Sequence, residues 1–114
     1  GPIDEDAIVA NIVAMVQLAK VNGIRPVVGT IPPAAQFFWR PEVTPVEKIR
    51  RINQMLRKAS KMHRFALVDY YRALATESGA LPTELGPDGV HPNEAGYARM
   101  EGVLTRKLPG LLIG

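Results

Sequence analysis

The sequence predicts an α/β fold in which parallel strands alternate with helices. Three segments carry apolar residues at helical spacing, namely residues 4–22, 45–62 and 93–107. Between them lie two short apolar runs without a helical period, residues 26–31 and 65–69. Continuous apolar runs of this length are typical of strands that are covered on both faces. Because helical segments separate the two runs, right-handed crossovers are expected to join them in parallel.

The first helical segment, residues 4–22, begins with three acidic residues that complement the helix dipole. Its apolar positions predict a wide buried face made of Ile8, Val9, Ile12, Val13, Met15, Val16 and Ala19. Asn22-Gly23 is typical of a helix C-terminus. We therefore expect a helix that packs along one side.

The second helical segment has a strong start signal. Thr44-Pro45-Val46-Glu47 combines a capping box with proline at the first helical position. An apolar stripe then runs to His63, which lies beside Lys61 and Arg64. A basic cluster at a helix end favours interaction with the helix dipole, so we interpret His63 as structural rather than catalytic.

The third helical segment follows Asn93, which is a favourable N-cap. The helix is expected to bury Tyr97, Met100, Val103 and Leu104 and to end before Pro109-Gly110. Upstream, Asp69 closes the second apolar run. Its expected role is to cap a short helix over residues 70–76.

Composition limits the class of protein. The 114 residues, 46% of them apolar, support one small domain, and no second domain fits. The net charge is +3, and the densest basic segment, residues 48–64, interleaves charges with apolar positions. This pattern indicates a solvated helix face rather than a nucleic-acid site. The absence of cysteine excludes thiolate chemistry, and no apolar run reaches the roughly 18 residues of a membrane span.

The loop before the third helix carries the chemistry. Asp88 and His91 stand three residues apart, and Pro92 keeps His91 out of helical conformation. Histidine is suited to moving protons near neutral pH, and a neighbouring carboxylate can fix its tautomer. A nucleophile is not evident. The alternative is that the aspartate and histidine form only a structural turn hydrogen bond.

Residues 34–43 show neither a helical nor a strand period. They contain Phe37, Phe38 and Trp39 just beyond the carboxyl end of the first predicted strand. In an open α/β sheet, ligands bind at that end. These aromatic residues either pack onto the core or form the wall of a substrate pocket.

The motif Asp88-Gly89-Val90-His91-Pro92-Asn93, followed by Gly96-Tyr97, resembles the last conserved block of the SGNH hydrolases, also called the GDSL esterase/lipase family. Other segments resemble bacterial acetylhydrolase-type members, namely Gly29-Thr30-Ile31-Pro32-Pro33, Trp39-Arg40-Pro41, Ile52-Asn53 and Val68-Asp69-Tyr70-Tyr71. The resemblance covers the whole chain but only the C-terminal half of the family's domain. It implies a three-layer α/β/α, flavodoxin-like fold, of which this chain would be a partial domain lacking the half that bears the nucleophile.

The resemblance implies hydrolysis of short-chain acyl or acetyl esters, with carbohydrate and lipid esters as candidates, through a serine acyl-enzyme. His91 matches the general base and Asp88 matches the carboxylate that orients it. The serine of the Gly-Asp-Ser block and the glycine and asparagine of the oxyanion hole belong to blocks that this sequence lacks. Ser60 lies in a basic helical segment and Ser78 in a loop without a strand-to-helix elbow, so neither replaces the missing serine.

The expected partner is therefore the N-terminal half of the same hydrolase, either as a separate chain or as a missing segment. A homo-oligomer is an alternative assembly. The resemblance implies no metal and no organic cofactor, and it slightly favours a secreted or periplasmic location. By itself, this chain is expected to be inactive.

Two other functions stay open from the residues alone. Two buried parallel strands leave unpaired backbone at both sheet edges, so the chain suits a non-enzymatic module that pairs through an exposed edge. A flavodoxin-like domain that binds a phosphate or nucleotide is the third hypothesis. It is the weakest because no glycine-rich phosphate loop follows either strand.

Overall fold

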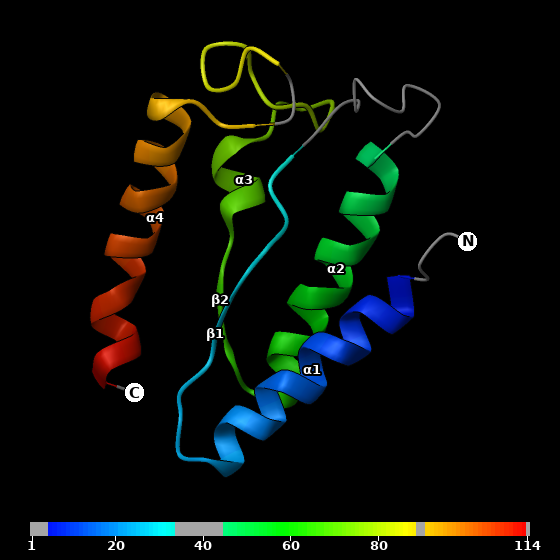
Figure 1. The fold of residues 1–114 in the computed structure, drawn as a ribbon, viewed down its shortest axis with the longest axis vertical. Helices are drawn as coiled ribbons and strands as arrows, with labels where there is room; N and C mark the ends of the chain where they lie inside the picture. Colours follow the sequence, from blue (N-terminus) through cyan, green and yellow to red (C-terminus); the bar gives the residue numbers. More distant parts are fainter. Residues whose placement is uncertain (1–4, 34–44, 89–90, 114) are drawn as a thin grey trace.

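The protein is an α/β structure in a computed structural model that describes residues 5–33, 45–88 and 91–113. Its elements are, in chain order, α1 Glu5–Val21, β1 Val27–Gly29, α2 Pro45–His63, β2 Ala66–Val68, α3 Tyr70–Leu74 and α4 Glu94–Ile113. Helices α1 and α2 lie on one side of the strands and α4 lies on the other (Figure 1). This arrangement confirms the predicted fold class.

The two strands pair in parallel, as the sequence predicts. Val27 lies opposite Ala66 and Gly29 lies opposite Val68. The strands are shorter than the predicted runs of residues 26–31 and 65–69. At the end of β1, the backbone N–H and carbonyl of Ile31 bond to the side-chain amide of Asn53 at 2.8 and 2.9 Å, so a side chain replaces a neighbouring strand there.

Two apolar clusters hold these elements together. The larger one joins α1, α2 and the start of β2 through the buried residues Val9, Val16, Ile52, Leu56, Ala59 and Phe65. The smaller one joins α3, the following loop and α4 through Leu74, Leu81 and Leu85, with Met100 packed against them. The loop that carries Asp88 and His91 is thus supported by a different core from the one that holds α1 and α2.

The helix starts are as predicted, but the burial of three side chains is not. Met15, expected in the buried face of α1, is 63% exposed, and Tyr97, expected to be buried by α4, is 57% exposed. Val27 of β1, in a run expected to be covered on both faces, is 45% exposed. Helix α1 packs mainly against α2, and α4 packs against α3 and β2. Met15 and Tyr97 therefore lie on parts of α1 and α4 that these contacts leave uncovered.

Helix α4 is also longer than predicted. It continues to Ile113 and contains Pro109, although proline was expected to end it. A proline inside a helix removes one backbone donor but leaves later N–H groups able to bond, so the helix can continue at an energetic cost. Within the described residues, no helix has both the length and the apolar run that crossing a membrane requires.

Asp69 links the ends of the two strands with α2. Its carboxylate accepts hydrogen bonds from Arg57 Nε at 2.9 Å and from Thr30 Oγ1 at 3.1 Å. It also caps α3, as predicted, by accepting from the Arg72 amide at 3.1 Å. Burial favours the neutral acid, but these hydrogen bonds and the charge of Arg57 outweigh burial and lower the pKa of Asp69.

This lowered pKa predicts acid sensitivity of folding. A carboxylate whose pKa is lower in the folded state stabilises the fold above its unfolded pKa, about 3.8, and this stabilisation is lost as pH falls through the folded value. We expect the free energy of unfolding to decrease below about pH 4. The Asp69→Asn variant is expected to be less stable at pH 7 by about 1–3 kcal/mol and to show a shallower acid dependence. Urea denaturation across pH checks this, and parallel pH curves for both proteins would contradict it.

Candidate active site

Asp88 and His91 are brought together on the loop before α4. His91 Nδ1 lies 2.8 Å from Asp88 Oδ2, and the backbone N–H of His91 donates to Asp88 Oδ1 at 2.7 Å. One carboxylate therefore fixes both the imidazole ring and the backbone that carries it. With Asp88 ionised, Nδ1 carries the proton and Nε2 presents its lone pair, which is the form that a general base needs.

The imidazole is accessible. The side chain of His91 is 67% exposed and that of Asp88 is 39% exposed. Exposed Asp–His pairs contribute little to stability, since water competes for both groups. The arrangement is better suited to proton transfer with a group that approaches from outside than to holding the fold together.

The loop is closed at its base by Asn93. Its side chain caps α4 by accepting from the Gly96 amide at 2.9 Å, as predicted for an N-cap. Its side-chain Nδ2 donates to the Glu84 carbonyl at 2.9 Å, and its backbone N–H donates to the Leu85 carbonyl at 2.6 Å. We call the paired segments 84–86 and 91–93 the neck of the loop.

Two glycines allow the neck segments to approach closely. A Cβ on Gly96 would lie 2.6 Å from the Leu85 carbonyl oxygen and 2.8 Å from Pro92 Cβ. A Cβ on Gly86 would collide with the Leu81 side chain and lie 2.6 Å from the His91 carbonyl oxygen. Glycine at these positions is thus a packing requirement.

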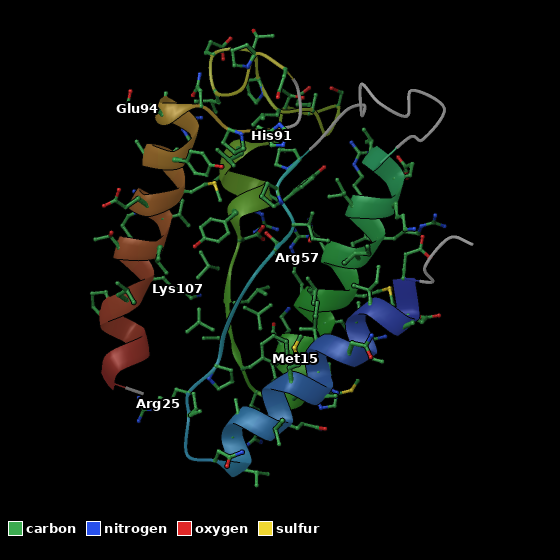
Figure 2. All side chains as sticks on the ribbon, viewed as in Figure 1. Met15, Arg25, Arg57, His91, Glu94 and Lys107 are labelled. Atoms are coloured by element: carbon green, nitrogen blue, oxygen red, sulfur yellow. The ribbon has the colours of Figure 1, made fainter. Side chains whose placement is uncertain are left out.

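The pair lies at the end of the molecule expected for a site in an α/β fold. Figure 2 shows His91 above α3, at the end toward which both strands run, whereas Arg25 lies toward the other end. A cavity of about 310 Å³ is lined by residues that include Val27, Phe65 and Arg64, at the starts of the strands. This cavity is therefore not part of the Asp88–His91 site.

Of the other residues singled out in the sequence, the structure describes Ser60, His63 and Ser78. Phe37, Phe38 and Trp39 lie outside the described residues. Ser60 Oγ donates to the Arg57 carbonyl within α2, and the Ser78 hydroxyl bonds to that of Thr76 at 3.0 Å. His63 lies in the last turn of α2, as predicted for a dipole partner. Neither serine is positioned by the contacts that a histidine-activated nucleophile requires.

Sequence reasoning missed the side chains that fix the end of β1. Asn53 is fully buried and holds Ile31, while Arg57 holds Asp69. The available signal was a polar residue within the apolar stripe of α2, because Asn53 stands between the buried positions Ile52 and Leu56. Across the part of the chain that the structure describes, no three His, Cys, Asp or Glu side chains gather as metal ligands would.

Comparison with known proteins shows the family of this chain. The model of the GDSL-like lipase/acylhydrolase family matches residues 1–99. No curated protein matches the chain. Among solved structures, a GDSL-like lipase from Bacteroides thetaiotaomicron is 33% identical, with a TM-score of 0.88 over 96% of this chain and 55% of its own.

Two further structures are similar. A Bacteroides fragilis protein, provisionally named an acylhydrolase, is 35% identical, with a TM-score of 0.89 over 98% of this chain and 55% of its own. A Streptococcus pneumonia protein, provisionally named a platelet activating factor, shares the fold at 20% identity, with a TM-score of 0.80 over 93% of this chain and 52% of its own. The chain thus spans about half the length of these proteins. It belongs to the GDSL-like lipase/acylhydrolase family.

Proposed function

We propose that this chain supplies the acid–base half of a serine esterase, with His91 as general base and Asp88 as the carboxylate that orients it. The observation that carries the proposal is the pairing of both Asp88 oxygens with His91, one on the ring and one on the backbone. Membership of an acylhydrolase family supports ester hydrolysis as the reaction. The substrates would be short-chain acyl or acetyl esters.

In the proposed reaction, a serine hydroxyl attacks the ester carbonyl while its proton passes to His91 Nε2. Asp88 Oδ2 accepts a hydrogen bond from Nδ1–H and thereby stabilises the imidazolium that forms. The imidazolium then protonates the leaving alkoxide, which leaves an acyl-enzyme. In the second stage of the reaction, His91 removes a proton from water and the resulting hydroxide attacks the acyl group. The acid is released and the serine recovers its proton from His91.

The serine and the oxyanion-hole donors would come from a second, nucleophile-bearing half, in the same polypeptide or in another chain. Support comes from the solved relatives, of whose length this chain covers 55%. We refer to the protein that contains both halves as the assembled hydrolase. Phe37, Phe38 and Trp39 are proposed to line its acyl pocket, since they follow β1 on the side where ligands bind in such sheets.

The second half is proposed to cover the edge of β1 and the adjoining face of α1. Within the described residues β1 pairs only with β2, so its other edge can accept a parallel strand. Three exposed apolar residues of α1, Met15, Leu18 and Val21, stand at helical spacing, and Ile24 and Val27 are exposed between the end of α1 and the start of β1. Exposed apolar residues that stand close together in this way mark a surface that another part of a protein covers.

The division of roles predicts that the 114-residue chain by itself shows no saturable turnover of p-nitrophenyl acetate. Removing the nucleophile and oxyanion hole forfeits most of the rate enhancement, because a base alone leaves the carbonyl without an attacking group held in place. The assembled hydrolase is expected to turn the ester over. Steady-state rates of both proteins check this, with His91→Ala as control. Saturable activity of the isolated chain that His91→Ala abolishes would contradict the proposal.

A further inference from the structure

We propose that Asn93 is a positioning residue, which sets where the Asp88–His91 pair stands relative to the rest of the molecule. The inference rests on the proposed function and adds to it a residue that does not touch substrate. It begins from a geometric fact about the pair. Because Asp88 and His91 are three residues apart and bond to each other locally, their pairing fixes the ring relative to the loop only.

The position of the loop in the molecule depends on the neck. The described part of this loop leaves the neck at Gly86 and returns at His91. Asn93 makes the polar contacts across the neck, with its side-chain Nδ2 on the Glu84 carbonyl and its backbone N–H on the Leu85 carbonyl. Leu85 is 5% exposed in the smaller apolar cluster, so the contact reaches from the loop to a packed core.

The two ends of the Asn93 side chain have separable effects. Its oxygen bonds the Gly96 amide within α4 and stabilises the helix. Its nitrogen bonds the Glu84 carbonyl nine residues away and joins the helix to the incoming segment. A serine at this position keeps an oxygen that can cap the helix but lacks the donor that reaches Glu84. Asn93→Ser therefore tests positioning with the cap retained, whereas Asn93→Ala removes both contacts.

In the assembled hydrolase, Asn93→Ser is expected to lower kcat by about 10- to 100-fold, because displacing a catalytic group by about 1 Å costs on that order. KM and the pH midpoint of kcat are expected to stay close to wild type, since Asp88 still holds the ring. Asn93→Ala is expected to lose kcat to a similar extent and also to lose thermal stability. Active-site titration with a fluorophosphonate normalises each rate to the folded, competent enzyme.

A steric variant reaches the same neck by another route. Gly96→Ala improves helix propensity but places a methyl group against the Leu85 carbonyl, so it is expected to lower kcat although α4 itself is favoured. Wild-type kcat per titrated site in Asn93→Ser would overturn the inference. A shifted pH midpoint in that variant would overturn it too, because Asn93 would then act on the ionisation of His91 rather than on its position.

A second measurement separates this inference from the proposed function. Imidazole nitrogen NMR of His91 in the assembled hydrolase shows which ring nitrogen carries the proton. Hydrogen exchange of the backbone N–H at position 93 shows how often the neck opens. Asn93→Ser is expected to keep the Nδ1–H signal and to speed exchange of the amide. If no ester is hydrolysed, the proposed function fails while this measurement still tests positioning. Unchanged exchange would overturn the positioning role even in an active enzyme.

Discussion

Replacing His91 with alanine in the assembled hydrolase is expected to lower kcat by about 10⁴- to 10⁶-fold with little change in KM. The serine hydroxyl is a weak nucleophile at neutral pH, and its attack requires a base that takes the proton in the transition state. Because the imidazole acts mainly in that transition state, its loss should leave ground-state binding of the ester nearly unchanged.

The chain contains a matched control for this experiment. His63 is its other histidine and lies in the last turn of α2. His63→Ala is expected to keep kcat within about twofold, since a residue in the last turn of a surface helix contributes at most a small dipole interaction. Equal losses in the two variants, or a His91→Ala enzyme that keeps more than a tenth of the activity, would exclude His91 as the base.

Asp88→Asn is expected to lower kcat by about 10²- to 10⁴-fold while the fold is retained. The asparagine oxygen can still accept from the His91 backbone N–H, so the loop keeps its shape. The amide nitrogen, however, donates toward Nδ1 and favours the tautomer with its proton on Nε2. An imidazole in that tautomer cannot accept the serine proton.

A variant that makes the same change of charge elsewhere identifies the cause of this loss. Glu101→Gln makes the same change of charge at an exposed position on α4 and serves as control. Wild-type kcat in Asp88→Asn, or an equal loss in Glu101→Gln, would show that Asp88 has no specific part in orienting His91.

The sequence predicted best the features that are encoded locally. Asp88, His91 and Asn93 lie within a few residues of one another, and Pro92 restricts the backbone between them, so the loop geometry follows from short-range chemistry. The helix starts at Pro45 and Glu94 were predictable for the same reason. The pairing of β1 with β2 followed from the order of the elements.

Features that depend on distant contacts were not predictable. The end of β1 is set by Asn53, which is 22 residues from Ile31, and by Asp69, which is 39 residues from Thr30. The apolar patterns also overstated burial of Met15 and Tyr97, because a helical pattern identifies an apolar face but not the element that covers it. Exposed apolar residues on both sides of the strands agree with a chain that spans about half of its solved relatives.

Covalent labelling with a fluorophosphonate tests the central claim most directly. The reagent modifies a serine that a neighbouring base activates, and peptide mass spectrometry locates the adduct. We expect a single adduct in the assembled hydrolase, on a serine outside the 114 residues of this chain, formed at a rate that His91→Ala reduces by at least about 10³-fold. An adduct on Ser60 or Ser78, or labelling at the same rate in His91→Ala, would contradict the assignment of this chain as the acid–base half of a serine esterase.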